Sequence, residues 1–368
     1  MLEARSDVVG SLLRPTELLE ARERYARGEI DAAAFKEVED AAVDAALQLQ
    51  EEAGLDVVTD GEMRRLSFQS QMVEAVEGFG DWDLDAFLWG EWRSEELGDL
   101  KIERPPLAVV GRLRRRRFLC AEELAYARGR TDRVVKVTVP SPTLFAQFWE
   151  NERSRPSYPT LESFIDDVAQ ILRDEVEELV RLGARYIQID APHYPLLVDE
   201  RYRTLYESRG WPAERRLEFG LAYDNALMAG HPSHVTFGFH LCRGNQMGRW
   251  LVAGGYDWLA ERLFPRIAAH RLLLEYDDQR SGSFQPLRHV PDDKVVVLGL
   301  VTTKSRRRET VEELLRRLEE ASQIVPWERL ALSPQCGFAP SVAGSTLGLQ
   351  DQEAKLRVVA ETARAAWG

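Results

Sequence analysis

The sequence predicts an α/β protein whose core is a parallel sheet closed into a (β/α)₈ barrel. Short apolar runs rich in β-branched residues alternate with long amphipathic stretches, and about eight such runs occur. No glycine-rich dinucleotide-binding turn follows the first run, which argues against an open doubly wound sheet, the alternative arrangement. A chain of 368 residues is long enough to bury one large core, so we expect residues 1–368 to form a single barrel domain.

The predicted strands are apolar runs bounded by polar or turn residues, as expected for strands buried on both faces of a parallel sheet. They cover Val8–Val9, Asp56–Thr59, Val134–Val139, Tyr186–Asp190, Val235–His240, Leu272–Tyr276, Lys294–Leu300 and Leu330–Leu332. Helical periodicity fills most of the stretches between them. The predicted helices cover Thr16–Leu49, Leu161–Leu182, Leu217–Ala229, Tyr256–Phe264, Glu309–Ile324 and Gln352–Ala366.

Residues 78–130 do not fit this alternation. They lie between the second and third predicted strands, where a single helix is expected. We expect an insertion here, with antiparallel hairpins that cover the barrel mouth or form a contact between subunits of a homo-oligomer. Its Trp82, Trp89 and Trp92 either stack on a flat donor molecule or form the core of the insertion. The basic run Arg112–Arg117 belongs to the same insertion, and a solvated strand edge is the alternative to a role at the barrel mouth or in a subunit contact.

Composition and charge restrict the class of protein. The chain has 48 basic and 61 acidic residues, and its net charge of −13 argues against non-specific binding to nucleic acid or to an anionic membrane. No window approaches the roughly 20 apolar residues of a membrane span, and no secretory signal pattern is present. Three cysteines are too few for a disulfide framework. We therefore expect a cytoplasmic protein without nucleic-acid or membrane partners.

Four potential metal ligands lie at the ends of predicted strands. His240 and Cys242 are two residues apart, so they point to the same side of an extended strand. Glu275 and Cys336 lie at two later strand ends. One imidazole, two thiolates and one carboxylate make a tetrahedral site that favours Zn²⁺ over Mg²⁺ or Ca²⁺. Taken singly, a buried histidine or cysteine more often has a structural role.

Other polar residues lie at the remaining strand ends, which converge on one mouth in a barrel. These residues are Ser11, Glu62, Ser141, Asp190 and Lys304. The carboxylates of Glu62 and Asp190 suit an ammonium group, although loop capping is the alternative for each. Zinc with two thiolate ligands activates water weakly, but it lowers the pKa of a bound thiol. This set of residues therefore favours an enzyme of thiol chemistry.

The sequence motifs at these strand ends, taken together in their order along the chain, resemble the catalytic half of cobalamin-independent methionine synthase. The resemblance covers nearly the whole chain. Its carriers are Val9-Gly10-Ser11, Asp60-Gly61-Glu62, Tyr186-Ile187-Gln188-Ile189-Asp190, His240-Leu241-Cys242, Glu275 and Ser333-Pro334-Gln335-Cys336-Gly337. The runs Cys242-Arg243-Gly244-Asn245 and Leu274-Glu275-Tyr276-Asp277 resemble the stand-alone bacterial branch of this family. That branch includes methionine-synthase-like proteins and the epoxyalkane:coenzyme M transferases.

The resemblance implies a (β/α)₈ barrel of the type that uroporphyrinogen decarboxylase and methionine synthase share. It implies Zn²⁺ as the cofactor, with the ligands His240, Cys242, Glu275 and Cys336. A thiol substrate would take a coordination position, and Ser11, Glu62 and Asp190 would bind the amino-acid end of homocysteine. The leading prediction is a zinc-dependent alkyltransferase that moves a methyl group from an alkyl donor to homocysteine or a similar small thiol.

The sequence departs from the full-length family in two ways. It lacks the N-terminal barrel that helps to hold a polyglutamyl folate, and Gly299–Ser305 lacks the histidine that protonates the folate leaving nitrogen. Lys304 stands near that position, and His193 follows the strand end at Asp190, so these two are the candidate catalytic acids. Loop capping is the alternative for His193. Both departures argue against methyl-folate as the donor and leave thiol activation intact.

Two other functions stay open. In the first, an epoxide is the electrophile and coenzyme M is the thiol. The sulfonate of coenzyme M would need cationic anchors, and the candidates are Arg14, Arg64, Arg243 and Arg280. Loop salt bridges are the alternative role for these arginines. In the second, the protein is a non-catalytic, zinc-binding regulatory protein. The absence of a histidine from Gly299–Ser305 is the main support for this function.

Overall fold

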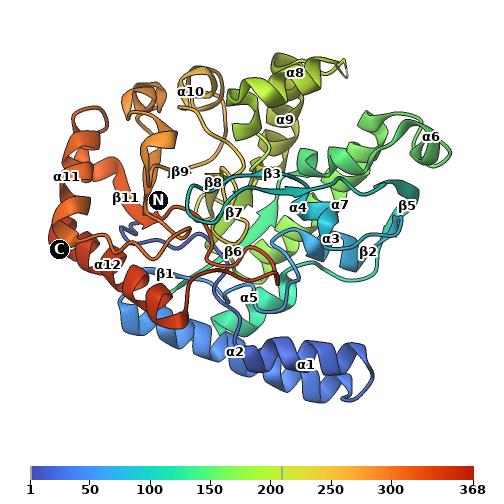
Figure 1. The fold of residues 1–368 in the computed structure, drawn as a ribbon, viewed down its shortest axis with the longest axis horizontal. Coiled ribbons are helices and arrows are strands. Elements are labelled where there is room, and N and C mark those ends of the chain that lie inside the picture. The colour runs from blue at the N-terminus through green and yellow to red at the C-terminus, as the bar shows by residue number, and fades with distance from the viewer. Residues whose placement is uncertain (1, 209) are drawn as a thin grey trace.

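The core of the protein is a curled, seven-stranded parallel sheet. The computed structural model describes residues 2–208 and 210–368. The strands, in their order across the sheet, are β1 (Val57–Val58), β6 (Val134–Pro140), β7 (Tyr186–Asp190), β8 (Thr236–Leu241), β9 (Arg271–Glu275), β10 (Val295–Val301) and β11 (Leu330–Pro334). All neighbouring pairs are parallel. These strands confirm seven of the eight predicted ones (Figure 1).

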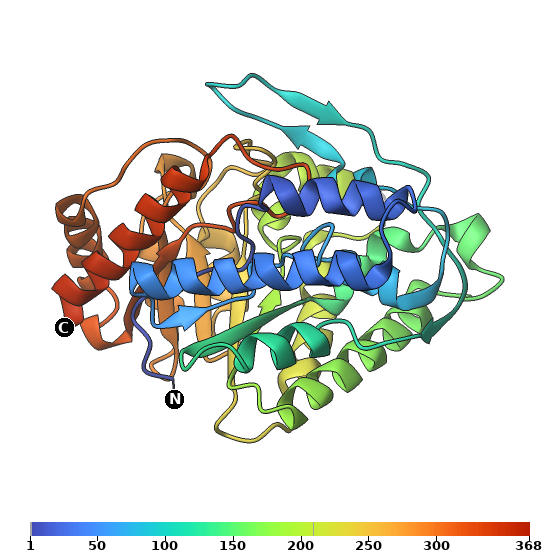
Figure 2. The same cartoon turned by 90° about the horizontal axis from the view of Figure 1, so that it is seen from below.

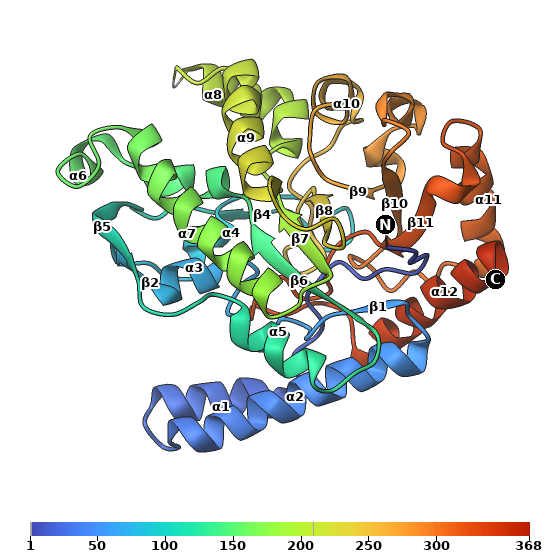
Figure 3. The same ribbon diagram turned by 180° about the vertical axis from the view of Figure 1, so that it is seen from behind.

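Helices cover the outer side of this sheet (Figure 3). They include α2 (Ala32–Ala53), α5 (Ala121–Arg128), α7 (Leu161–Arg181), α9 (Ala213–Met228), α10 (Asp257–Leu263), α11 (Val311–Ser322) and α12 (Leu349–Trp367). Helix α7 begins after a capping box of Thr160 and Ser163, and its buried residues recur at helical spacing from Phe164 to Leu179. Such one-sided apolar helices must bury that side, and the apolar sheet is the surface available.

The eighth predicted strand, Val8–Val9, is not formed. A single parallel bridge joins Ser6 to Leu332 of β11, and the N–H of Asp7 donates to the Leu332 carbonyl oxygen at 2.9 Å. The Val8 N–H donates to the side chain of Asp7 instead of to a neighbouring strand. The described residues therefore form a curled sheet of seven strands, and an eight-stranded barrel is not shown.

One further predicted element is corrected, and one helix was not predicted. The predicted helix over Thr16–Leu49 is two helices, α1 (Thr16–Ala26) and α2, which run side by side (Figure 2). Gly28 takes a left-handed φ of 72° after α1, and the Asp31 side chain accepts from the Ala34 N–H to begin α2. The structure also contains α8 (Glu200–Ser208), which the sequence analysis did not predict.

Two short antiparallel pairs lie between β1 and β6 in the chain. Strand β2 (Val76–Phe79) pairs with β5 (Val109–Arg115), and β3 (Gly90–Trp92) pairs with β4 (Leu100–Ile102). The β3–β4 hairpin projects from the body at the top of Figure 2. Its Arg93 N–H donates to the Trp250 carbonyl oxygen at 2.8 Å, which ties the hairpin to the loop after β8. Helices α3 (Ser70–Ala75) and α4 (Asp85–Leu88) lie in the same part of the chain.

The register of the sheet brings the carboxyl ends of its strands to one level. Asp190 at the end of β7 pairs with His240 near the end of β8, and Glu275 at the end of β9 pairs with Gly299 in β10. Residues that follow these strands therefore meet at one end of the sheet. Among the described residues, no helix combines the length and apolarity needed to cross a membrane.

Candidate metal centre and cavity

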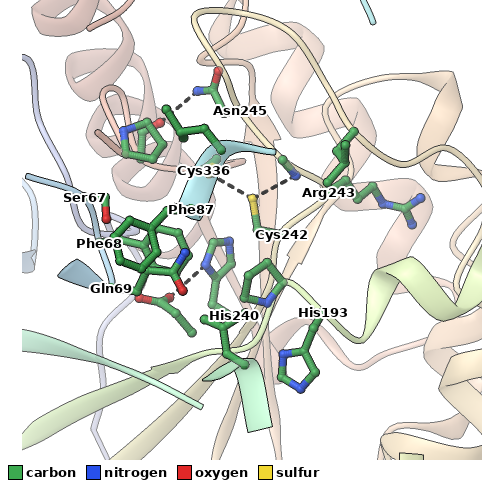
Figure 4. A pocket seen from close by; sticks show the side chains of 18 of the residues that line it. Ser67, Phe68, Gln69, Phe87, His193, His240, Cys242, Arg243, Asn245 and Cys336 are labelled. Carbon is green, nitrogen blue, oxygen red and sulfur yellow. Dashed lines mark hydrogen bonds and ion pairs between the residues drawn. The ribbon is translucent and has the colours of Figure 1, made fainter. Parts of the chain in front are cut away.

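His240, Cys242 and Cys336 form the candidate metal centre. His240 belongs to β8, Cys242 follows that strand by one residue, and Cys336 follows β11. Their potential ligand atoms all lie within 4.8 Å of one another, and the two sulfur atoms are 3.1 Å apart (Figure 4). Residues separated by about 100 positions thus meet because parallel strands end at the same level.

Asp190 orients the imidazole of His240. The Nδ1 atom of His240 lies 3.1 Å from Oδ1 of Asp190, whereas Nε2 is buried and has no hydrogen-bond partner among the described residues. A carboxylate on one ring nitrogen with the other nitrogen free is the arrangement of a metal-binding histidine. Burial lowers the pKa of His240, but the hydrogen bond to Asp190 and the charge of Cys242 outweigh it and raise that pKa.

The contact between the two thiols shifts their pKa values in opposite directions. The shared hydrogen bond with Cys336 lowers the pKa of Cys242, whereas the same contact, together with burial, raises the pKa of Cys336. The Cys242 sulfur also accepts from the Gly244 N–H at 3.2 Å. In the metal-free protein Cys242 is therefore the thiol that ionises first.

Glu275 lies beside this centre but is not one of the three clustered residues. Its Oε1 accepts from Nζ of Lys304 at 2.7 Å, and its Oε2 accepts from the backbone N–H of Arg243 at 3.0 Å. Burial lowers the pKa of Lys304, but the charges of Asp277 and Glu275 together raise it above its usual value. Lys304 is therefore a charged partner of Glu275 at neutral pH and not a ready proton donor.

The three clustered side chains fit Zn²⁺ by their chemistry. One unpartnered imidazole nitrogen and two sulfur atoms are the soft and borderline donors that this ion prefers. The carboxylate of Glu275, which accepts from Lys304, is the nearby group that could complete four ligands.

A cavity of about 150 Å³ opens next to the cluster (Figure 4). Its wall is mostly apolar and includes Phe68, Phe87, Leu88, Trp89, Trp92, Leu144, Leu196, Leu251 and Val252. Four of these come from α4 and β3 or the residue between them. Trp89 and Trp92 thus face the site, whereas Trp82 is not in the wall and packs on Phe87 at 5.5 Å.

The three predicted contacts of the amino-acid end, Ser11, Glu62 and Asp190, all line the cavity. Glu62 takes a left-handed φ of 56°, its Oε1 accepts from the Thr138 hydroxyl at 2.9 Å, and its buried Oε2 has no hydrogen-bond partner among the described residues. Burial raises the pKa of Glu62. This free carboxylate oxygen suits a cationic ligand group that would replace the lost water.

Arg14, a candidate substrate contact because it could anchor a sulfonate, is not in the cavity wall. Its guanidinium donates to the backbone carbonyl oxygens of Ala339, Glu62 and Arg65 at 2.8 to 3.0 Å. Arg14 therefore braces the loops around the site.

His193 lines the cavity, as an acid or a substrate contact would. Its Nε2 lies 2.9 Å from the Thr143 hydroxyl oxygen, and its ring packs on Tyr194 with centroids 4.5 Å apart. Burial lowers the pKa of His193 to about 3, so the imidazole is neutral at pH 7.

Of the four candidate sulfonate anchors, only Arg243 is in the cavity wall. Its guanidinium donates to the Gly254 carbonyl oxygen and lies over the Tyr256 ring, 4.2 Å from the centroid. Arg64 pairs with Glu39 and Asp40. Arg280 pairs with Asp278 near Glu275.

Sequence analysis missed Arg65, which holds Glu62 in place. Arg65 is 1% exposed, lies 3.6 Å from Oε1 of Glu62 and donates to the Thr138 hydroxyl at 2.8 Å. Its NH2 group is 2.6 Å from Glu123. The position of Arg65 three residues after Glu62 was a signal for this contact. Its partner Glu123 lies in α5, within the segment that was expected to form antiparallel hairpins.

Comparisons with known proteins show the family of this chain. Residues 5–236 and 260–364 match the family model described as the catalytic domain of cobalamin-independent synthase. The uncharacterized protein YxjH of Bacillus subtilis (strain 168) is 33% identical over 365 residues, 99% of this chain and 94% of that protein. Methionine synthase of Pyrococcus abyssi is 28% identical and covers 90% of this chain and 86% of its own length.

The fold is also similar to a solved structure of a putative vitamin-B12-independent methionine synthase from Listeria monocytogenes. The TM-score is 0.74 at 28% identity, with 99% of this chain and 98% of that chain covered. The chain therefore belongs to the cobalamin-independent methionine synthase family, as its sequence motifs predicted.

Proposed function

We propose that this protein is a zinc-dependent methyltransferase that acts on homocysteine or a similar small amino thiol. The observation that carries the proposal is the meeting of His240, Cys242 and Cys336 with the carboxylates of Glu62 and Asp190 around one cavity. Zinc at this centre would lower the pKa of the substrate thiol, so that a thiolate is present at neutral pH.

The side chains divide into two groups by their chemistry. His240, Cys242 and Cys336 would hold the metal, with Asp190 keeping the imidazole oriented. Glu62 has a free, buried oxygen for the substrate ammonium, and Ser11 lies in the same wall. Holding the thiol and the carbon electrophile in one small cavity lowers the entropic cost of their encounter.

Neither candidate acid suits proton transfer at neutral pH. Lys304 is paired with Glu275, and His193 has a pKa of about 3. The proposal therefore favours an alkyl donor whose leaving group departs without a proton from the protein. The apolar wall supports a donor with an apolar body.

The reaction of an epoxide with coenzyme M has less support. Arg14, Arg64 and Arg280 are outside the cavity wall and engaged with other groups, and two carboxylates in the wall would repel a sulfonate.

We also infer that the N-terminal segment takes the place of an eighth barrel strand. Ser6 bridges Leu332 of β11, and the backbone N–H groups of Arg5 and Ser6 donate to Asp56, which precedes β1. The segment thus links the two edge strands of the curled sheet, which is where the missing strand of a (β/α)₈ barrel belongs.

Zinc binding and thiol coordination test the function directly. We expect purified protein to bind zinc, and Cys242→Ser and Cys336→Ser to weaken that binding at least about tenfold. Cys120→Ala is the control, because Cys120 is also buried and free but is not in the cluster. A zinc-edge absorption spectrum should gain a sulfur neighbour when homocysteine is added. Zinc binding that survives both serine replacements, or a spectrum that homocysteine does not change, would contradict the proposal.

A further inference from the structure

A buried column of polar side chains runs inside the curled sheet and ends at the candidate metal centre. It starts at Asp7, whose Oδ1 lies 2.8 Å from Nζ of Lys136 on β6. The same Nζ donates to Oε1 of Gln188 on β7 at 2.7 Å. Nε2 of Gln188 then donates to Oδ1 of Asp190 at 2.7 Å, and that oxygen contacts Nδ1 of His240 at 3.1 Å.

The charge of Lys136 determines which way the Gln188 amide points. An ammonium group only donates, so the amide must turn its oxygen toward Lys136. Its NH₂ group must then face the opposite way, where it donates to the carbonyl oxygen of Val9 at 2.9 Å and to Asp190. The reversed amide would set its NH₂ against the ammonium. Lys136 is itself held by Asp7, and both side chains are fully buried.

This arrangement gives the two carboxylate oxygens of Asp190 different surroundings. Oδ1 accepts from both Gln188 and His240. Oδ2 takes part in neither of these hydrogen bonds, and Asp190 is part of the cavity wall. We propose that Gln188 is a positioning residue, which holds Asp190 so that one oxygen orients His240 and the other faces the ligand. This inference rests on the proposed function.

The column links metal binding to thiol binding through one carboxylate. Without the Gln188 donor, Asp190 could rotate and present either oxygen to His240, so the imidazole would lose its fixed orientation. Buried amides that only fill space would have no such effect on a metal centre. The column therefore predicts a loss in metal affinity that exceeds any general loss in stability.

The variant Gln188→Glu tests this role, because it keeps the size of the side chain and an oxygen for Lys136 but replaces the NH₂ donor to Asp190 with a carboxylate oxygen that repels it. Gln50→Glu is the matched control. Gln50 is also fully buried, its Nε2 also donates to two oxygens, those of Ala46 and Thr59, and it is outside the cavity wall. The measurement is the zinc dissociation constant, by competition with a chelator in the absence of substrate.

We expect Gln188→Glu to weaken zinc binding by about 10- to 100-fold and Gln50→Glu to change it less than about twofold. Equal zinc affinities of Gln188→Glu and wild type, or equal losses in both variants, would overturn the positioning role. If Gln188→Glu does not fold, Gln188→Met replaces it, with the same expectations. Wild-type protein that binds no zinc would instead refute the proposed function, so the two failures are distinguishable.

Discussion

Nζ of Lys304 lies 2.7 Å from Oε1 of Glu275, and both side chains are buried beside the candidate metal centre. Lys304 therefore holds the carboxylate that the sequence analysis predicted as the fourth metal ligand. The same ammonium is 3.8 Å from Asp277, and the Arg280 guanidinium is 3.6 Å from Glu275. Lys304 would therefore compete with a metal ion for Glu275. Its ammonium acts as the partner of this carboxylate and not as a proton donor.

Replacement of Lys304 by methionine should destabilise the metal-free protein more than the zinc-loaded protein. Without its ammonium partner, the buried Glu275 carboxylate should cost about 3 kcal/mol of unfolding free energy. Zinc would then take the place of the lost cation, and the cost should shrink. Urea unfolding with EDTA and with saturating zinc measures both values.

Lys355→Met is the control for this experiment. Lys355 pairs with Glu309 at 3.2 Å, and both side chains are nearly fully buried, but neither is in the cavity wall. The unfolding free energy lost in Lys355→Met should not depend on zinc. If the loss in Lys304→Met is also independent of zinc, Glu275 is not a ligand.

Asp224 should make the protein less stable as the pH rises from 5 to 8. Burial raises its pKa to about 7, and its Oδ2 accepts from the Tyr194 hydroxyl at 2.6 Å. An unfolded aspartate has a pKa of about 3.9, so the folded state binds the proton more tightly. The resulting stabilisation is complete below about pH 4 and is lost as the pH rises through about 7.

Asp224→Asn, which cannot ionise, isolates this effect. The stability of the variant relative to wild type should rise between pH 5 and pH 8 by about 2.7 kcal/mol, because the folded-state pKa of about 7 lies about two units above pH 5. Urea unfolding of both proteins in EDTA at the two pH values gives the comparison. Asp60, whose pKa burial also raises to about 7, is present in both proteins and cancels. A difference that is the same at pH 5 and pH 8 would contradict this account.

Most of the sheet was predictable because its strands are uniformly apolar and bounded by turn residues. Tyr186–Asp190 was predicted to the residue. Val8–Val9 is apolar too, but its neighbour Asp7 bonds Lys136 and Tyr186 inside the sheet, which draws the backbone away from regular strand pairing. Those partners lie 129 and 179 residues along the chain, so no local pattern reveals them.

The clustering of His240, Cys242 and Cys336 was also predictable, because parallel strands bring their ends together whatever the spacing in sequence. The partners of these residues were not. Sequence position placed Glu275 with the ligands, but the structure pairs it with Lys304. Asp190, predicted as a substrate contact, is also the partner of His240. Such contacts depend on which rotamer each side chain adopts in the folded core, and that is a property of packing.

Glu62 should select thiols that carry an ammonium group. Its free oxygen lies in the cavity wall, and Arg243 is the one cationic side chain among the described residues of that wall. Homocysteine should therefore raise the melting temperature of the zinc-loaded protein more than coenzyme M does at equal concentration. Glu62→Gln should weaken homocysteine binding about tenfold, since a charge-assisted hydrogen bond is lost.

2-Mercaptoethanol is the control ligand, because it offers zinc a thiol without an ammonium group. Its effect on the melting temperature should be the same in wild type and Glu62→Gln. Stronger protection by coenzyme M than by homocysteine would favour the sulfonate substrate and refute the amino-thiol assignment.

Gly244 should tolerate alanine much less well than Gly344, although both have nearly the same left-handed φ, of 90° and 89°. A Cβ at Gly344 would meet no atom within 4 Å. A Cβ at Gly244 would lie 2.6 Å from the Trp92 ring and 2.8 Å from Cβ of Leu251, both in the cavity wall. The left-handed backbone costs both variants about 1–2 kcal/mol, and overpacking should cost Gly244→Ala about 1–3 kcal/mol more.

Urea unfolding of the two single variants measures this difference, and a double-mutant cycle assigns it to the hairpin. Trp92→Leu removes the nearer part of the contact, so Gly244→Ala should cost less in that background than in wild type. Equal costs of the two glycine replacements would show that the β3–β4 hairpin yields freely to the added methyl group. A larger cost at Gly244 would mean that the glycine after Cys242 and Arg243 is required because Trp92, from the inserted segment, packs closely against the loop after β8.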